Sequence, residues 1–328
     1  MTIGRVAQLW RYPVKSLGGE QVEQTEFGPR GVLGDRLWAI RDLERDVTAS
    51  ARQLPVLLTA TARYVGPLLP DTGPRNVPEV ELAFPDGAVW SSSDGGVHAK
   101  LSELADREVR LTALPPADDT SLHRMNRERR ADAMSPATLR AGFGVTDGEK
   151  LPDVSMMRVS DLVTLAQYST PPGTFVDLAP VHVLSQTSME TMGAEIGGEV
   201  DVRRFRPNVL LALDHSEEDF PEARWTGAHL TLGEVVLDVT MPTVRCVVPS
   251  RAQPGFEVNR QVTRAVAARA ERCLGVYCWV KSGGSVRIGD QVAVRPATVR
   301  RRYLGDAARR AKRLAFGLVT GAADRLSQ

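Results

Sequence analysis

Cys246 is the residue of this sequence whose type and neighbour point most directly to chemistry. It follows an apolar stretch and comes directly after Arg245, and a neighbouring cation favours the thiolate, the form of cysteine that binds metals. The alternative is a buried cysteine that packs as a small hydrophobic side chain. Cys273 and Cys278 are expected to do only that, because the first lies on a predicted apolar helix and the second in an apolar strand.

The loop at residues 12–19 is a second candidate, because it places Lys15 and Ser16 beside two glycines. Such a loop offers a cation, a hydroxyl and free backbone amides to a phosphate or another anion. It is not a P-loop, since the glycine spacing of that motif is absent. An ordinary turn is the alternative interpretation.

Two further segments carry arginines that could bind an anion. Arg36 could reach a ligand, although its position next to Asp35 favours a simple ion pair. The segment 203–208 holds three guanidiniums, among them Arg206, and ends at Asn208, whose amide both donates and accepts hydrogen bonds. Guanidinium forks suit phosphate and carboxylate. A solvated charge cluster is equally compatible with this spacing.

The composition is that of a folded globular protein with no global attraction to polyanions. Its 328 residues exceed what one hydrophobic core usually organises, which predicts two domains. Lys and Arg number 41 against 40 Asp and Glu, so the formal net charge is +1 and we expect no nucleic-acid partner.

The cysteine and histidine content excludes several metal sites. Three cysteines cannot build a disulfide framework or supply four thiolates to an iron–sulfur cluster. The five histidines are scattered without ligand spacing, so neither a zinc site nor a catalytic triad is readable. Without a signal peptide or a long apolar run at the sequence level, the expected location is cytoplasmic.

The elements that must position these residues are mainly β-strands, with α+β elements in the second half. Alternating apolar residues predict strands at 79–84, 109–112, 276–280, 286–288 and 292–294 and a hairpin at 229–239. Helical spacing and capping residues predict helices at 160–165, near Ser188, and at 261–274, the last ending at Gly275.

The chain is divided into four predicted segments. A Pro-, Asp-, Arg- and Ser-rich stretch without apolar periodicity is interpreted as a solvated connector. The final stretch keeps apolar residues at helical spacing, and eight Lys or Arg against two Asp give it a charge of +6. The segments are residues 1–115 (first domain), 116–150 (connector), 151–296 (second domain) and 297–328 (basic amphipathic helix).

Taken together, these segments resemble the MOSC family, over nearly the whole chain to about residue 295. The 12–19 loop and the Gly34-Asp35-Arg36 turn resemble a MOSC N-terminal β-barrel domain. Similarity to the β-rich MOSC domain itself rests on residues 184–188, 204–208, 245–246 and 275–290. Two domains of these kinds are therefore expected.

The resemblance implies a function. Members similar to the mitochondrial amidoxime-reducing component bind molybdenum through a pterin cofactor of the molybdopterin type and one cysteine, and reduce small N-hydroxylated compounds. This implies that Cys246 is the catalytic metal ligand, in keeping with the preference of soft metals for thiolate. The residues implied to contact the pterin and its phosphate are Lys15, Ser16, Arg36, Ser185, Thr187, Ser188, Arg206 and Asn208.

The alternative function is a carrier that holds the cofactor, or a persulfide sulfur, on Cys246 without turnover. The family usually has a Thr-Thr-Val-Asp-type run after this cysteine, whereas this chain has Val248-Pro249-Ser250-Arg251-Ala252, so the support of the site is expected to differ. Electrons are expected from a separate donor protein. The basic tail could dock to such a partner, to an anionic membrane surface, or to its own barrel.

Overall fold

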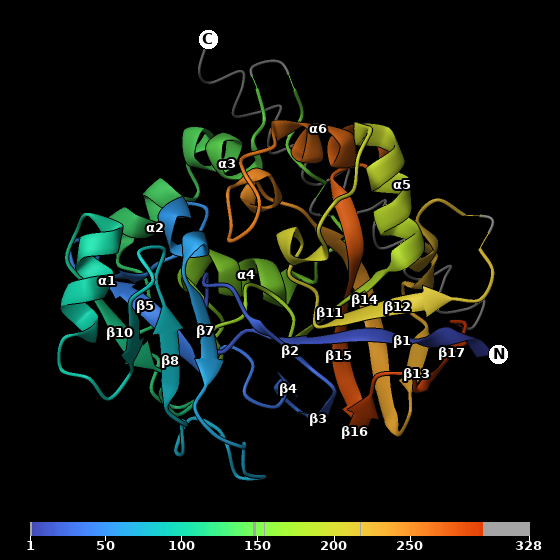
Figure 1. The fold of residues 1–328 in the computed structure, drawn as a ribbon. Helices are drawn as coiled ribbons and strands as arrows, with labels where there is room; N and C mark the ends of the chain where they lie inside the picture. The colour runs from blue at the N-terminus through green and yellow to red at the C-terminus, as the bar shows by residue number, and fades with distance from the viewer. Residues whose placement is uncertain (1, 147–148, 154, 217, 298–328) are drawn as a thin grey trace.

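The computed structural model describes residues 2–146, 149–153, 155–216 and 218–297. Its centre is a closed barrel of seven strands, in which the first strand of the chain pairs with strands of the second half (Figure 1). Strand β1 pairs with β12 on one side and β17 on the other, which closes the ring. The barrel order is β12 (Val209–Leu213), β11 (Val181–Ser185), β15 (Cys273–Ser282), β14 (Val235–Val244), β13 (His229–Leu232), β17 (Gln291–Arg295) and β1 (Thr2–Arg11), and β2 (Glu20–Val22) extends it beyond β1.

The barrel interior is filled by branched aliphatic side chains from alternating positions. Strand β14 alternates buried and half-buried residues along its whole length, as a strand with one face in a core must. The predicted hairpin at 229–239 is confirmed as β13 and β14. Its turn contains Gly233, whose φ of 53° lies in the left-handed region that glycine adopts without strain.

Three small sheets surround the barrel, and two of them form the core of the N-terminal segment. Helix α1 (Val97–Ala105) buries one face against this core, as does the short 3-10 helix η1 (Pro55–Thr59). The predicted strands at 79–84 and 109–112 are confirmed as β8 and β10. The sheets are β10 (Val109–Ala113), β5 (Trp38–Asp42) and β6 (Val47–Thr48); β7 (Thr61–Tyr64), β8 (Val80–Ala83) and β9 (Val89–Ser91); and β16 (Gly284–Arg287), β3 (Gln24–Gly28) and β4 (Gly31–Val32).

The predicted connector contains two short helices, α2 (Arg127–Ala133) and α3 (Pro136–Phe143), neither of which has a buried residue. Asn126 and Ser135 cap them through their side chains, so local hydrogen bonds stabilise them rather than burial. Beyond them, α4 (Val159–Gln167) confirms the helix predicted at 160–165.

Two helices cover the outside of the barrel at β11 and β12 (Figure 1). Helix α5 (Gln186–Ile196) confirms the prediction near Ser188 and is capped by Ser185, and α6 (Arg260–Arg269) packs beside it. Their buried faces form an apolar layer with Leu184 and Leu210 from the two strands. This apolar layer joins the two helices to strands β11 and β12.

The predicted end of the last helix is wrong. Helix α6 ends at Arg269, since Glu271 and Arg272 have positive φ angles of 48° and 62°, and Cys273 begins strand β15. The expectation that Cys273 lies on a helix is therefore wrong as well. Gly275 is a strand residue with a φ of 78°, and a Cβ at this position would lie 2.3 Å from Nε2 of His182.

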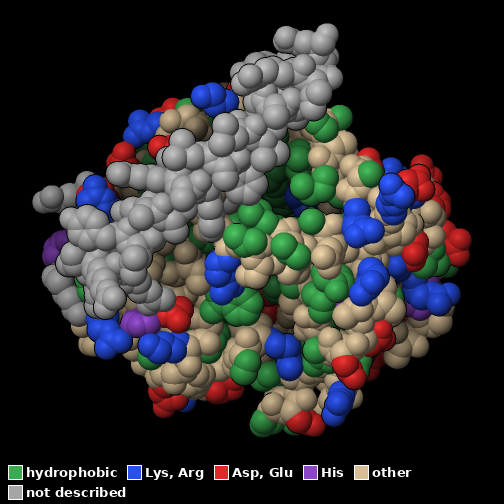
Figure 2. Space-filling model, turned by 180° about the vertical axis from the view of Figure 1, so that it is seen from behind, with side chains coloured by type: hydrophobic (Ala, Val, Ile, Leu, Met, Phe, Trp, Pro, Cys, Tyr) green, Lys and Arg blue, Asp and Glu red, His purple; other side chains and the backbone are tan. Residues whose placement is uncertain are grey.

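On the face shown in Figure 2, Lys and Arg side chains lie among Asp and Glu side chains, in keeping with the near-zero net charge. Within the described residues, no helix is long and apolar enough to span a bilayer. The predicted basic helix at 297–328 lies outside the described residues apart from residue 297, and the predicted segment boundaries stay a prediction.

Candidate functional site

Cys246 lies just past the end of β14, where the chain leaves the barrel. It is half-buried, and the adjacent backbone is held by the Arg245 N–H, which donates to the Arg272 carbonyl at 2.8 Å. The next N–H, that of Val247, donates to the carbonyl of Gly142 in α3 at 3.0 Å. The predicted connector is therefore part of the wall beside this cysteine.

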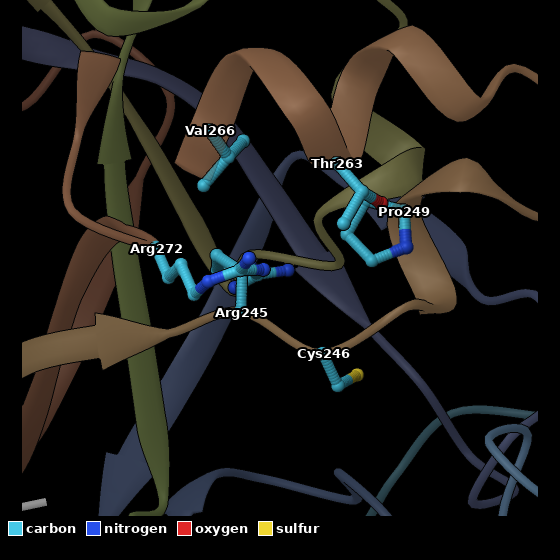
Figure 3. A pocket seen from close by; sticks show the side chains of 6 residues that line it. All are labelled: Arg245, Cys246, Pro249, Thr263, Val266 and Arg272. Atoms are coloured by element: carbon cyan, nitrogen blue, oxygen red, sulfur yellow. The ribbon is translucent and has the colours of Figure 1, made fainter. Parts of the chain in front are cut away.

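The sulfur of Cys246 faces the N-terminal segment. Figure 3 shows it on the opposite side of the backbone from the Arg245 guanidinium and pointing away from helix α6. The Cys246 residue packs against a small apolar cluster formed by Ala51, Leu58 and Val248. The N–H of Ala51 donates to the hydroxyl of Ser16 at 3.0 Å, so the loop predicted to bind an anion is joined to this cluster.

Lys15 is the most deeply buried cation of the site, with 4% of its surface exposed. Its Nζ donates to the carbonyl of Phe175 at 3.1 Å and to Oδ1 of Asp177 at 2.5 Å. Burial lowers the pKa of Lys15, and the charge of Asp177 opposes that shift. The pKa of Asp177 is in turn held well below its usual range by Lys15 and by Arg52, against a desolvation that acts in the other direction.

Arg36 is held by Asp35, with which it forms a salt bridge, as the sequence favoured. Asp35 also accepts the N–H of Tyr12 at 2.8 Å, and the Arg36 guanidinium lies 5.1 Å from the centre of the Tyr12 ring. Burial alone would lower the pKa of Arg36, but the surrounding carboxylates raise it above its ordinary value. Pairing with Asp35 thus does not exclude a ligand, since the guanidinium has five donors.

Arg206 carries the clearest sign of a missing partner. Its Nη1 donates to the carbonyl of Leu17 at 2.5 Å, and its guanidinium lies 4.3 Å from the centre of the Tyr12 ring. Its Nη2 is buried and has no hydrogen-bond partner among the described residues. Burial, followed by repulsion from Arg36, lowers the pKa of Arg206 to about 10. A buried guanidinium with a free donor is costly unless an anion occupies the space next to it.

Arg245 joins this cluster from the other side of the barrel end. Its Nη2 donates to the carbonyl of Phe205 at 2.7 Å, and its Nη1 lies 3.4 Å from Nε2 of His182. Its Nε is buried without a partner among the described residues. Burial lowers the pKa of Arg245, and the pKa of His182 lies well below its ordinary value because of burial and this neighbouring guanidinium. His182 is therefore neutral at physiological pH.

Three of the seven described non-glycine residues with positive φ belong to this site. Ser16, Arg36 and Arg206 have φ angles of 74°, 51° and 54°, in the left-handed region that non-glycine residues rarely adopt. Each such residue costs of order 1 kcal/mol or more and persists where the surrounding structure requires it, often at binding sites. All three were candidate cofactor-binding residues from the sequence.

The remaining sequence candidates lie outside this cluster. Asn208 is buried, and its amide accepts the N–H of His182 at 3.1 Å and donates to the carbonyl of Trp10 at 3.4 Å, so it connects β11 to β1. Ser185 and Ser188 are fully buried, and their hydroxyls interact with each other and with Glu222. Thr187 is half-buried near the start of α5. A cofactor role for these four residues stays a prediction.

Several residues of the cluster were not found from the sequence. Asp177, His182 and Tyr277 carry no local motif, and they meet the 12–19 loop only through the pairing of distant segments, since His182 lies opposite Tyr277 on the paired strands β11 and β15. Tyr277 lies on β15 within electrostatic range of Cys246, and burial raises its pKa to about 12. Its phenol is therefore protonated at neutral pH.

Helix α6 closes the back of the site. Between the helix and Cys246 lies a gap lined by two guanidiniums and by apolar side chains, with no space for a water molecule (Figure 3). It is a packing defect rather than a binding pocket. The lining residues are Arg245, Cys246, Pro249, Thr263, Val266 and Arg272.

The arrangement as a whole suits an anion that brings a metal with it. Four cations, Lys15, Arg36, Arg206 and Arg245, lie within electrostatic range of Asp177, whose side chain is 64% exposed, and Arg36 also pairs with the buried Asp35. No group of three or more His, Cys, Asp or Glu among the described residues could hold a bare metal ion. A metal at Cys246 would therefore need most of its ligands from another molecule, and an anionic one would match the charge.

Two family models match the chain. The model described as "MOSC N-terminal beta barrel domain" covers residues 3–86, and the model described as "MOSC domain" covers residues 171–293. The first contains Lys15, Ser16 and Arg36, and the second contains Arg206 and Cys246. The matched regions therefore hold both halves of the cluster, and they support the resemblance seen in the sequence.

Similar curated proteins share low identity over most of the chain. "Mitochondrial amidoxime-reducing component 1" of Mus musculus is 25% identical over 322 residues, covering 88% of this chain and 82% of that protein. The human protein of the same name is 23% identical, with the same coverage. Among solved structures, the match to the YuaD protein from Bacillus subtilis covers 90% of this chain and 96% of the YuaD chain, with a TM-score of 0.39 and 11% sequence identity.

Proposed function

Because this chain carries a MOSC N-terminal beta barrel domain followed by a MOSC domain, we propose that it is a molybdenum-cofactor enzyme that reduces small N-hydroxylated compounds. The observation that carries the proposal is the half-buried Cys246 next to Arg245, a member of a cation cluster in which Arg206 and Arg245 each have a buried donor without a partner among the described residues. The similarity to amidoxime-reducing components suggests the reaction.

The residues present fit the cofactor. Lys15, Arg36 and Arg206 would hold its phosphate, because buried cations and guanidinium forks bind phosphate oxygens and the free Nη2 of Arg206 would gain an acceptor. The thiolate of Cys246 would bind the metal. When bound, the cofactor supplies the two-electron chemistry by which an N–OH group becomes N–H with release of water.

Around this centre, the chain's own residues control protons and charge. His182 is neutral, and its Nε2 lies 3.4 Å from Nη1 of Arg245. It therefore contacts that guanidinium without adding charge to the site. Tyr277 lies within electrostatic range of Cys246, and because burial raises its pKa to about 12, its phenol stays neutral there and adds no charge.

The reaction consumes two electrons, and we propose that a separate donor protein supplies them.

Replacement of Cys246 by alanine tests the proposal. We expect the purified, folded variant to lose turnover of an amidoxime with an artificial electron donor, because the metal loses its protein ligand. Cys273→Ser, which changes another half-buried cysteine, is the matched control and should retain turnover. Full activity in the Cys246 variant would reject the role of the thiol. A cofactor-loaded wild type that reduces no amidoxime or hydroxylamine would instead indicate a carrier that holds the cofactor, or a persulfide sulfur, on Cys246.

A further inference from the structure

The segment that follows Cys246 leaves three of its carbonyls without a backbone donor among the described residues. We call residues 246–259 the Cys246 loop; it contains the 3-10 helix η4 (Val248–Ser250) and leads into α6. The N–H and carbonyl groups of Gln253 and Phe256 bond reciprocally at 3.0 Å, and the Asn259 N–H donates to Ser250 at 2.9 Å. The carbonyls of Pro249, Arg251 and Glu257 accept no described backbone N–H, and the buried one, that of Pro249, needs a donor from elsewhere.

Arg204 supplies that donor for all three carbonyls. It extends from the 3-10 turn η2 (Val202–Arg204) and is buried, with 7% of its surface exposed. Its Nη1 donates to Pro249 at 3.1 Å and to Arg251 at 3.2 Å, and its Nη2 donates to Glu257 at 2.8 Å. The guanidinium also lies 4.1 Å from the centre of the Phe256 ring. The Arg204 guanidinium therefore ties the beginning and the end of the loop to the η2 turn.

The charge of Arg204 is not used in an ion pair, since it forms no salt bridge with any described residue. Burial lowers its pKa, with Asp201 acting in the opposite direction. The nearby arginines have other partners. Arg203 forms a salt bridge with Asp201 at 2.6 Å, and Arg206 belongs to the cation cluster. A buried guanidinium whose donors all go to one loop is suited to fixing the shape of that loop.

The loop in turn sets the position of the sulfur. On one side, Cys246 is held by β14 and the bond from Arg245 to Arg272; on the other, η4 begins at once, with the Ser250 N–H donating to Val247 at 3.1 Å. Val248 of the loop packs with Cys246 against Ala51. Any loosening at Pro249 is therefore transmitted over three residues to the sulfur.

We propose that Arg204 is a positioning residue, whose guanidinium holds the Cys246 loop so that the thiol is presented in one orientation to its ligand. This rests on the proposed function for the identity of that ligand, but not for the restraint itself. A lysine at this position keeps the charge but cannot donate in three fixed directions, so it would leave at least one carbonyl without its donor.

The test measures the reactivity of Cys246 in the cofactor-free protein. In a Cys273→Ser background, iodoacetamide alkylation at Cys246 is followed by peptide mass spectrometry, since Cys278 is buried. We expect Arg204→Lys to change the alkylation rate by roughly tenfold, the effect of about one lost hydrogen bond. Arg203→Lys is the matched control, because Arg203 lies in the same turn and over the same ring but bonds to Asp201, and its rate should stay within about twofold of the parent.

The outcomes separate positioning from stability and from the proposed function. A lower melting temperature in Arg204→Lys with an alkylation rate equal to that of Arg203→Lys would overturn the proposal. If Arg204→Lys does not fold, Arg204→Gln takes its place, since its amide cannot donate to all three carbonyls; a changed rate there supports the proposal, and a rate equal to that of Arg203→Lys overturns it. Because no cofactor is present, a protein that never binds molybdenum would still give the predicted difference, so the two proposals can fail independently.

Discussion

At the residue scale, the site is an electrostatic arrangement that is incomplete by itself. Four cations, one buried and three half-buried, share two carboxylates, and two buried guanidinium donors lack partners among the described residues. Burying unpaired charge costs free energy, and a protein retains such a cluster where a ligand provides the opposite charge. The left-handed φ angles of Ser16, Arg36 and Arg206 add strain at the same place.

The residue types were readable from the sequence, whereas their grouping was not. Lys15 and Arg206 stood out because cations beside glycines or in dense clusters suit anions, but a turn and a solvated cluster explained the same spacing. Asp177, the acceptor for Lys15, gave no signal because its role depends on a contact between residues 162 positions apart. Pairing of this kind cannot be inferred from local patterns.

His123 gives a pH dependence at this scale. It is fully buried, its Nδ1 lies 2.8 Å from the Thr170 hydroxyl, and burial lowers its pKa to about 4. The folded state therefore keeps it neutral while the unfolded chain protonates it near pH 6.5. Its contribution to the unfolding free energy is complete above that pH and declines as pH falls toward 4, by at most about 3 kcal/mol.

Urea unfolding between pH 7.5 and 4 measures this effect. The stability of wild type should fall relative to His123→Asn as the pH drops, because asparagine keeps a hydrogen-bonding group but does not titrate. His215→Asn, at an exposed position, is the control and should follow the wild-type curve. A difference between wild type and His123→Asn that does not change with pH would show that the folded protein protonates this ring as readily as the unfolded chain.

At the element scale, periodicity predicted most of the structure near the site and failed at one glycine. Alternating residues identified β8, β10, β13 and β14 because each has one face in a core. Gly275 was interpreted as the end of a helix, since glycine often follows a helix C-terminus. It instead permits the close approach of His182 from β11, a contact between distant strands that sequence spacing does not reveal.

Substitution of Gly275 by alanine tests this explanation. A Cβ there would lie 2.3 Å from Nε2 of His182 and 2.7 Å from the Val183 carbonyl, in a backbone with a φ of 78°. We expect a loss of about 3 kcal/mol or more from clash and strain together. Gly197→Ala is the matched control, because its φ is 72° but a Cβ would meet nothing within 4 Å. It should cost only about 1 kcal/mol, and equal losses in denaturant unfolding would contradict the account.

At the scale of the whole molecule, the two matched regions are joined through one barrel. Strand β1 pairs with β12 and β17, so residues 2–11 complete a core made mostly by residues beyond 180 (Figure 1). The sequence predicted two β-rich units but not the pairing of β1 with strands of the second half, because strand pairing over nearly 300 residues leaves no local pattern. This pairing brings the 12–19 loop to the end of the barrel where Cys246 lies.

Removal of residues 1–11 should therefore disrupt the second half of the chain. Without β1, strands β12 and β17 become open edges and the apolar interior loses Val6 and Leu9, both fully buried. We expect the truncated protein to lose cooperative thermal unfolding, as followed by circular dichroism, and to regain it in part when a peptide of residues 1–11 is added. A truncated chain that unfolds like wild type would show that the barrel closes without this strand.

The molybdenum and pterin content of the protein, purified from cells that make the cofactor, tests the central claim most directly. Metal analysis and the pterin released on denaturation should show about one molybdenum and one pterin per wild-type chain, since one thiol and one cation cluster form one site. Cys246→Ser and Arg206→Met should each retain far less, although both remain folded. Wild-type protein without molybdenum, or variants that keep their full content, would contradict the account.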